Sequence, residues 1–326
     1  MKHISWGIIG CGDVTELKSG PAFNKVPRSS LIAVMRRDAA KAEDYARRHQ
    51  VPKWYSDAGQ LIDDPEINAI YVATPPSTHE EYTRAAIAAG KPVYVEKPMS
   101  VGSEPAKAMA QYASDKNIKV VVAHYRREQP LYKKIKQLLN EGTIGEIRLA
   151  SIQLYKKPLS DEDLAIPKTA WRVDPEIAGG GLFNDLSPHQ LDMLYYFFGE
   201  AAQVSGFAAQ QQHQYHAEDI VSGTILFKNN IVFSGTWCFN VGEALEKETC
   251  EIVGSEGKIS FSFFEHKPIV ITRGTKTDTI EFDPLQHVQQ PMIKAVVNYF
   301  LDDGPNPCSP DEGALIMDWI DRMRGL

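Results

Sequence analysis

The sequence contains no run of about 18 apolar residues, because charges or glycines interrupt every apolar stretch, so we expect no membrane-spanning helix. Its first residues lack a cationic segment followed by a long apolar one, which argues against a secretion signal and for a cytoplasmic protein. Basic residues are also few: 35 lysines and arginines face 42 aspartates and glutamates, for a net charge of -7. This balance argues against nucleic acid as the main partner.

Cysteine is scarce, and no internal repeat, low-complexity tract or flexible linker is evident. The four cysteines are widely spaced, without the paired spacing of zinc sites or disulfide frameworks: Cys11, Cys238, Cys250 and Cys308. We therefore expect reduced thiols.

The length of 326 residues is about twice that of a typical domain, so two domains are expected. In the first, residues 1–122, short β-rich runs alternate with helical stretches, which is typical of parallel βαβ units. The predicted strands are residues 4–9, 31–35, 69–73, 92–95 and 119–123. Runs that are apolar at consecutive positions indicate a sheet covered by helices on both faces.

The pattern changes in the second predicted domain, residues 123–326. An amphipathic helix at 131–140 precedes strands at 222–227, 231–237, 249–253 and 258–263, and two helices close the chain at 286–301 and 311–324. Short connections such as Lys228-Asn229-Asn230 indicate antiparallel hairpins. The expected fold class is α/β, with a parallel N-terminal sheet and a C-terminal α/β domain that carries an open, largely antiparallel sheet.

A glycine-rich turn follows the first predicted strand. Gly10 and Gly12 allow the backbone to turn sharply and approach a pyrophosphate at the next helix N-terminus, where Asp13 and Val14 follow. Thr15 occupies the place of the third glycine, a small residue that the motif tolerates. The turn opens a βαβ unit, so we predict dinucleotide binding.

The end of the second strand indicates which dinucleotide is bound. NAD-binding domains carry an acid there for the adenosine ribose, whereas this sequence has Arg36 and Arg37. Two guanidiniums suit a 2′-phosphate, so NADP(H) is favoured. Asp38 remains available to a ribose hydroxyl, which keeps NAD(H) open, and a solvated basic helix start is the ordinary alternative.

Three further segments carry a resemblance to a known family: Thr74-Pro75-Pro76-Ser77-Thr78-His79, Glu96-Lys97-Pro98, and Gly179-Gly180-Gly181-Leu182-Phe183-Asn184-Asp185 continuing to His189 and Asp192. With the glycine turn, they resemble the glucose-fructose oxidoreductase / inositol dehydrogenase / rhizopine-catabolism (Gfo/Idh/MocA) family over nearly the whole chain. The resemblance implies a Rossmann domain, followed by a domain for substrate binding and oligomerisation. It also implies hydride transfer between a nicotinamide cofactor and a sugar, cyclitol or related polyhydroxylated or keto compound.

The resemblance assigns Lys97, Asp185 and His189 to catalysis. An imidazole suits the removal of the alcohol proton, and a lysine would stabilise the charge that develops on the oxygen. Asp185 would orient the His189 ring if one helix carries both residues. Pro188 complicates that helix, since a restart with Ser187 as cap would change the spacing. Singly, each residue also has an ordinary structural interpretation.

The resemblance also indicates which other residues contact the cofactor and the substrate. The resemblance implies cofactor contacts from Thr74, Pro75, His79, Glu96, Lys97, Trp171 and Arg172. Substrate contacts are expected from Tyr125, Arg126 and Tyr155. We predict no metal site at His213, His216, Glu218 and Asp219, because their glutamine-rich surroundings are typical of a loop and the family's chemistry needs no metal.

Two other functions are compatible with the resemblance. One is a dihydrodiol dehydrogenase-like enzyme or dicarbonyl reductase, and the other is a nucleotide-binding regulator without turnover. The presence of Lys97 and His189 favours an enzyme. A homodimer or homotetramer is expected, because the later strands present alternating apolar residues and too few helices follow to cover both faces of their sheet.

Overall fold

A computed structural model describes residues 2–326, which divide into two compact units. The first unit combines the chain up to Gln129 with Leu285–Met317, and the second combines Pro130–Pro284 with Asp318–Leu326. These units differ from the ranges expected from the sequence, 1–122 and 123–326, because the chain returns to the first unit near its end. Helical periodicity indicates that the closing segments are helices, but it does not show which sheet they join.

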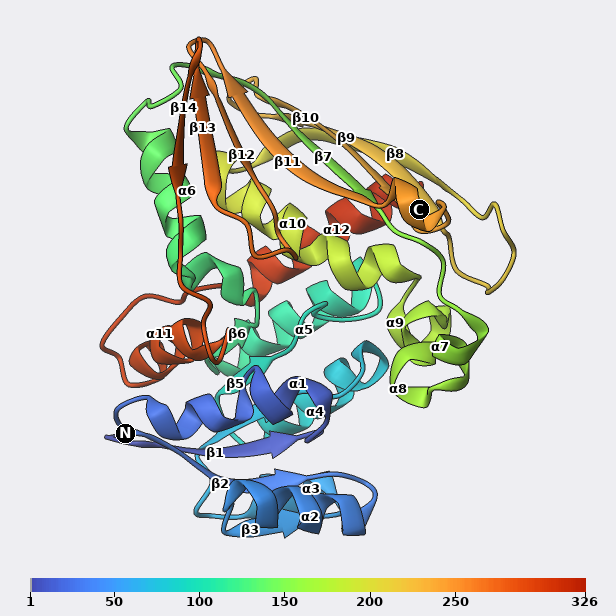
Figure 1. The fold of residues 1–326 in the computed structure, drawn as a ribbon. Coiled ribbons are helices and arrows are strands. Elements are labelled where there is room, and N and C mark those ends of the chain that lie inside the picture. Colours follow the sequence, from blue (N-terminus) through green and yellow to red (C-terminus); the bar gives the residue numbers. More distant parts are fainter. Residues whose placement is uncertain (1) are drawn as a thin grey trace. The chain divides into compact units, whose positions relative to one another are not determined.

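The first unit is built on a six-stranded parallel sheet in the order β3-β2-β1-β4-β5-β6 (Figure 1). Its strands are β1 (Ile4–Ile9), β2 (Ser29–Met35), β3 (Lys53–Tyr55), β4 (Ala69–Val72), β5 (Val93–Val95) and β6 (Val120–Val122). Every residue of β4, β5 and β6 is buried, as expected for strands covered on both faces. The predicted parallel sheet is confirmed.

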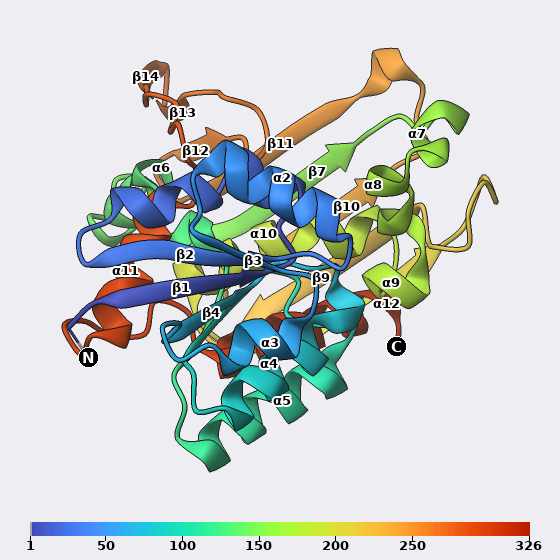
Figure 2. The same ribbon diagram turned by 90° about the horizontal axis from the view of Figure 1, so that it is seen from below.

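Helices lie on both sides of this sheet, with α2 on one side and α3, α4 and α5 on the other (Figure 2). The helices of the unit are α1 (Asp13–Leu17), α2 (Ala39–His49), α3 (Ala58–Asp63), α4 (His79–Ala88), α5 (Ser103–Lys116) and α11 (Gln290–Phe300), with 3-10 turns η1 (Gly20–Lys25), η2 (Pro76–Thr78) and η3 (Tyr125–Glu128). The strand order reverses between β1 and β4. In open parallel sheets, ligands bind beyond the carboxyl ends of the strands at such a point.

The second unit contains an eight-stranded sheet in the order β14-β13-β12-β11-β7-β10-β9-β8. Its strands are β7 (Ile147–Tyr155), β8 (Ala201–Ala209), β9 (Ile220–Phe227), β10 (Val232–Cys238), β11 (Lys247–Gly254), β12 (Lys258–Phe261), β13 (Ile269–Arg273) and β14 (Lys276–Ile280). Only β7 and β10 pair in parallel; the other neighbouring strands are antiparallel. The predicted open, largely antiparallel sheet is confirmed.

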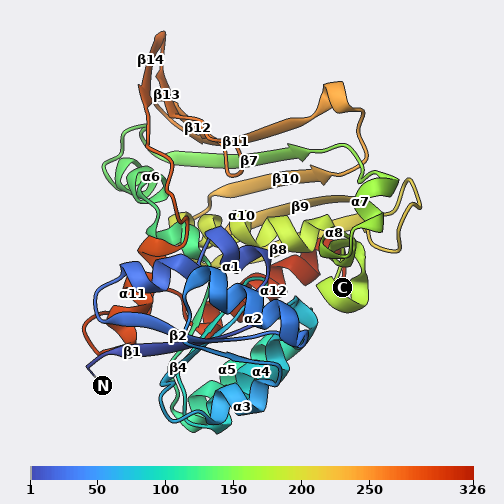
Figure 3. The same ribbon diagram turned by 60° about the horizontal axis from the view of Figure 1, so that its bottom comes forward.

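Helices cover one face of this second sheet, where α6 (Pro130–Asn140) and α10 (Leu182–Phe198) lie (Figure 3). Buried residues alternate with less buried ones along β9 and β11, so one side of each strand forms the core. The remaining elements are α7 (Asp161–Ala165), α8 (Pro167–Ala170), η4 (Trp171–Val173), α9 (Pro175–Ala178), η5 (Glu243–Leu245) and α12 (Pro310–Arg324), whose last turns belong to this unit.

Two expectations from composition are met in the structure. Within residues 2–326, no helix is both long and apolar enough to cross a membrane. All four cysteines are buried free thiols, in agreement with the expected reduced state. Burial raises the pKa of the Cys11 thiol to about 11, so this group in the glycine-rich turn stays protonated at neutral pH.

Candidate functional site

The glycine-rich turn joins the ends of three strands of the first unit. Gly10 has a φ of +93°, and a Cβ added there would lie 2.8 Å from the Thr74 backbone nitrogen, just beyond β4. The amides of Gly10 and Cys11 both donate to the Met35 carbonyl at the end of β2, at 2.9 and 3.1 Å. Glycine is required at position 10 because only glycine adopts this conformation at this close approach.

Gly12 has the opposite surroundings. A Cβ added there would meet no atom nearer than the Gly10 carbonyl oxygen at 4.0 Å, so open space lies beside the turn. Gly12 is also the N-cap of α1 and has no side-chain cap of its own. A dinucleotide pyrophosphate fits this open, uncapped turn. Thr15, in place of the third glycine, is fully buried and donates its hydroxyl to the Gly12 carbonyl at 2.8 Å.

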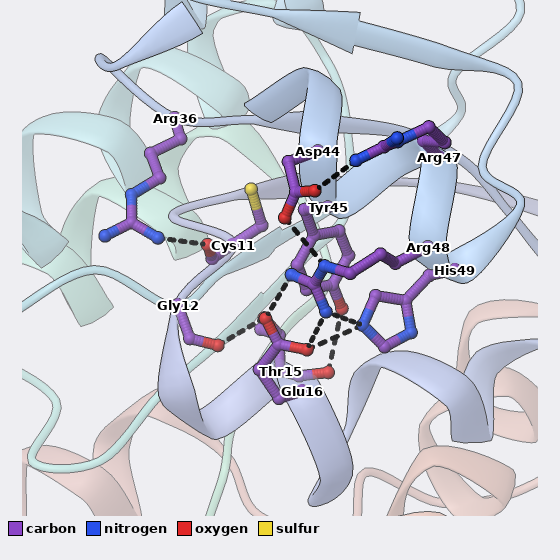
Figure 4. A network of polar contacts seen from close by, with 10 residues as sticks. All are labelled: Cys11, Gly12, Thr15, Glu16, Arg36, Asp44, Tyr45, Arg47, Arg48 and His49. Carbon is purple, nitrogen blue, oxygen red and sulfur yellow. Dashed lines mark hydrogen bonds and ion pairs between the residues drawn. The ribbon is translucent and has the colours of Figure 1, made fainter. Parts of the chain in front are cut away.

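The basic residues after β2 differ in what they contact. The half-buried Arg36 turns back to the glycine-rich turn and donates to the Cys11 carbonyl at 3.3 Å (Figure 4). Arg37 is exposed. Asp38 is the N-cap of α2, where its carboxylate accepts from the Lys41 amide at 3.2 Å. Asp38 therefore caps its own helix, and Arg36 is the charged side chain that lies against the turn.

An ion-pair network that the sequence did not reveal joins α1 to the end of α2. The Arg48 guanidinium holds both carboxylate oxygens of Glu16 at 2.8 Å and reaches Asp44 at 2.7 Å, and His49 lies 2.7 Å from Glu16 (Figure 4). The hydrogen bond from Arg48 lowers the pKa of Glu16 to about 2. This network fixes the short helix that follows the glycine-rich turn.

The Glu16 network predicts a pH-dependent contribution to stability. The pKa of Glu16 is depressed from its ordinary value of 4.5 to about 2, so the contribution is present above about pH 4.5 and is lost as the pH falls toward 2. The difference in Tm between wild type and Glu16→Gln should therefore be largest near neutral pH and shrink in acid. Glu43→Gln, on the exposed side of α2, is the control. A Glu16→Gln difference in Tm that is independent of pH contradicts the assignment.

The segment after β5 begins with a buried carboxylate. Glu96 accepts hydrogen bonds from the Tyr71 hydroxyl at 2.5 Å, from Gln289 Nε2 at 2.6 Å and from the Lys97 amide at 3.2 Å. Tyr94 donates to Gln289 Oε1 at 2.9 Å. Burial raises the pKa of both tyrosines, so their hydroxyls remain donors. The network holds the backbone of the half-buried Lys97 at the carboxyl end of the sheet.

His79 links the segment that begins at Thr74 to the segment that begins at Glu96. It is fully buried, with Nδ1 2.9 Å from the Pro98 carbonyl and Nε2 2.7 Å from the Thr74 carbonyl. Burial lowers the pKa of this imidazole. Both ring nitrogens face backbone oxygens, so His79 holds the segments after β4 and β5 next to one another. Direct cofactor contacts from His79, Glu96, Thr74 and Pro75 stay a prediction.

Helix α10 carries two of the three predicted catalytic residues. It runs without a break from Leu182 to Phe198 with Pro188 inside it, so the alternative of a restart at Ser187 is wrong. Asp185 and His189 therefore lie one turn apart on the same helix. Pro188 cannot donate a backbone hydrogen bond within the helix, and most residues of the helix are buried.

Asp185 and His189 each contact other residues of the second unit. Asp185 pairs with Arg172 at 3.2 Å, and the Arg172 guanidinium lies 4.7 Å from the centre of the Trp171 ring. The mostly buried His189 meets the Phe264 ring edge-on, with 6.1 Å between ring centres. The structure thus brings together Trp171, Arg172 and Asp185. Lys97 belongs to the first unit, and its meeting with His189 at one substrate stays a prediction.

The remaining predicted residues are spread over several elements. Tyr125 is buried in η3, with the Arg126 guanidinium 5.6 Å from the centre of its ring, and Tyr155 ends β7. Their substrate contacts also stay a prediction. In the region considered for a metal, Asp219 accepts from the amides of Gln211 and Gln212, at 2.9 and 2.8 Å. That carboxylate therefore orders its own loop.

Comparisons with known proteins agree with this arrangement. Residues 4–124 match the model of an oxidoreductase family with an NAD-binding Rossmann fold, and residues 132–260 match the GFO/IDH/MocA C-terminal domain. Oxidoreductase P35 of Formosa agariphila is 45% identical over 99% of both chains. Levoglucosan dehydrogenase of Pseudarthrobacter phenanthrenivorans is 31% identical over 81% of this chain and 74% of its own length.

A solved structure shows the same fold. Levoglucosan dehydrogenase in complex with NADH and levoglucosan superposes with a TM-score of 0.87, covering 98% of this chain and 96% of its own, at 24% identity. The two family models together cover residues 4–124 and 132–260, and the 45% identical relative covers nearly the whole chain. The chain therefore belongs to the Gfo/Idh/MocA family of oxidoreductases.

Proposed function

We propose that the protein transfers a hydride between NADP(H) and a carbinol or carbonyl carbon of a sugar, cyclitol or related polyhydroxylated compound. The observation that carries this proposal is the open, uncapped turn at Gly12, with Arg36 lying against it. That turn suits a dinucleotide phosphate, and the Glu96 network sets Lys97 at the same end of the sheet. The sugar-acting relative supports the substrate class.

In the proposed reaction, two residues act on the substrate hydroxyl and a third orients one of them. A bound nicotinamide supplies the hydride acceptor for oxidation and the donor for reduction. During oxidation, His189 takes the hydroxyl proton as the carbon–hydrogen bond breaks, and it returns the proton in the reverse direction. Lys97 donates a charged hydrogen bond to the same oxygen and stabilises the alkoxide-like charge. Asp185, paired with Arg172, orients the imidazole.

A substrate screen tests the proposal. The wild-type protein is incubated with sugars, cyclitols and keto-sugars, each with NAD(H) and NADP(H), and the nicotinamide absorbance is followed. Dihydrodiols and dicarbonyl compounds form a parallel arm that tests the alternative enzyme class. We expect turnover in the sugar arm, faster with NADP(H). Turnover only in the parallel arm, or tight cofactor binding with no turnover in any arm, contradicts the proposal.

We also propose that the protein self-associates through its eight-stranded sheet. Leu149, Val232 and Leu226 lie in one row across β7, β10 and β9, and they are 42%, 47% and 39% exposed. Ser234 and Thr224 are also exposed and lie two positions from Val232 and Leu226 on the same strands, so polar residues share this face. A row of exposed aliphatic side chains on a flat sheet is typical of a surface that a second copy covers.

Light scattering at micromolar concentration checks this proposal. Wild type should be a homodimer or homotetramer, and Val232→Glu should shift it toward the monomer, because a carboxylate would be buried without a partner in the middle of the row. Leu245→Glu is the control, since Leu245 is 67% exposed but lies in η5 outside the row. A monomeric wild type, or an equal effect of both substitutions, argues against this interface.

A further inference from the structure

The last residue of α12 contacts the turn that precedes α10. Arg324 forms a two-pronged ion pair with Glu218, with Nε to Oε1 at 3.1 Å and Nη2 to Oε2 at 3.2 Å. Its third nitrogen, Nη1, donates to the Gly179 carbonyl at 2.8 Å. Both side chains are mostly buried, at 13% and 10% exposed. We refer to this pair as the Arg324–Glu218 clamp.

Glu218 holds the other end of the same turn. Its Oε1 accepts from the Gly181 amide at 3.3 Å, and Gly181 is the N-cap residue of α10. The clamp thus fixes the turn at both ends, through the Gly179 carbonyl and the Gly181 amide. Glu218 also belongs to the group of residues considered for a metal, and the structure gives it this different role.

The three glycines of the turn leave it little freedom to move. Gly179 has a φ of +81° and ends α9, a conformation that favours glycine. A Cβ on Gly180 would lie 2.6 Å from the Asn184 side chain, and one on Gly181 would lie 2.7 Å from the Glu218 carbonyl oxygen. The backbone is therefore pressed against α10 on one side and against the Glu218 segment on the other.

The position of this turn sets the position of α10. The helix begins at Leu182, directly after Gly181, and the Asp185 amide already donates to the Gly181 carbonyl at 3.4 Å. A small shift or rotation at Gly181 would therefore be transmitted along the rigid helix to Asp185 and His189. Arg suits this role because its planar guanidinium fixes direction as well as distance.

We propose that the Arg324–Glu218 clamp is a positioning device for the active site, which holds α10 so that His189 meets the substrate hydroxyl. The proposal rests on the proposed function, because it assigns Arg324 and Glu218 an effect through His189. Neither residue takes part in the chemistry. The clamp fixes the depth and the rotation of the helix that carries the acid/base.

Substitutions at both ends of the clamp test this role. Arg324→Met should lower kcat about tenfold or more, because a misplacement of about 1 Å at a reacting group is costly. The Kd for NADPH should stay within about twofold of the wild-type value, since the phosphate-binding turn belongs to the first unit. Arg324→Lys should recover part of the loss. Arg322→Met is the matched control, because Arg322 pairs with Asp318 on the same helix, at 2.7 Å.

Hydrogen exchange of the backbone amides gives a readout that does not depend on turnover. Peptides that cover residues 179–189 should exchange faster in Arg324→Met than in wild type or Arg322→Met. If these peptides exchange at the same rate in Arg324→Met and in wild type, the proposal is wrong. Faster exchange with an unchanged kcat shows that the clamp stabilises the fold without positioning His189, and it also overturns the proposal.

Two further outcomes are separated by design. If Arg324→Met does not fold, Arg324→Lys and Glu218→Gln carry the same comparison, and each should show a lower kcat with faster exchange in residues 179–189. If the wild-type protein turns over no substrate, the proposed function fails. In that case the clamp is judged on hydrogen exchange alone, and equal exchange in wild type and Arg324→Met refutes it.

Discussion

Lys97→Ala and His189→Ala should each lower kcat by about a hundredfold or more, while the Kd for the cofactor changes little. In the proposed mechanism, the Lys97 ammonium acts on the charge that develops at the substrate oxygen, and the His189 imidazole moves the hydroxyl proton. Both interactions stabilise the transition state, so their removal should appear as a lower kcat. Steady-state kinetics and cofactor titration by fluorescence separate the two parameters.

The matched control for Lys97 is Lys107→Ala on α5, since Lys107 is a half-exposed lysine that pairs with Glu104. The His189→Ala variant should also change the shape of the pH–rate profile, because the substitution removes the proposed acid/base. Asp185→Asn should have a smaller effect, because the role proposed for Asp185 is to orient the imidazole. Wild-type turnover in both alanine variants would remove these residues from the mechanism.

The second large effect concerns the cofactor. NADPH should bind more tightly than NADH, with a Kd roughly ten- to a hundredfold lower. A charge-assisted contact is worth about 1.5–3 kcal/mol, and that range corresponds to the expected preference. Arg36 lies against the glycine-rich turn, whereas Asp38 is engaged as the cap of α2. The acid that could serve a ribose hydroxyl therefore has another partner.

Fluorescence titration of NADH and NADPH checks this preference. Arg36→Asp should reverse it, since a carboxylate accepts from ribose hydroxyls and repels a 2′-phosphate. Arg37→Asp is the matched control, because Arg37 is exposed and should contribute less. Equal Kd values for the two cofactors in wild type, together with no change in Arg36→Asp, would show that the arginines are only a solvated helix start.

Periodicity and glycine placement predicted most of the first unit correctly. The first strand is found at the predicted residues, Ile4–Ile9. The strands predicted at 69–73, 92–95 and 119–123 correspond to β4, β5 and β6. Strand β3 (Lys53–Tyr55) was missed, because three residues that begin with a lysine give no periodic signal. Local patterns report local structure well when they are long enough.

Contacts between residues far apart in the sequence were not predictable. Glu96 depends on Gln289, 193 positions away, and no pattern at either residue indicates the other. The same holds for Gly179 and Arg324, which are 145 positions apart. Asp185 pairs with Arg172, a partner that helical spacing alone could not show. Motifs therefore located the candidate site residues, while the side chains that hold them depend on tertiary packing.

Deuterium transfer from the nicotinamide ring to the substrate tests the central claim most directly. NADPH deuterated at the reactive face of C4 is incubated with the keto form of the substrate found in the screen, and the product is analysed by mass spectrometry and NMR. We predict that each product molecule gains one deuterium at the new carbinol carbon, and that His189→Ala slows this transfer. A reduced product that carries no deuterium, whichever of the two C4 hydrogens of NADPH is labelled, would contradict direct hydride transfer. Loss of the deuterium to water during the reaction would also contradict it.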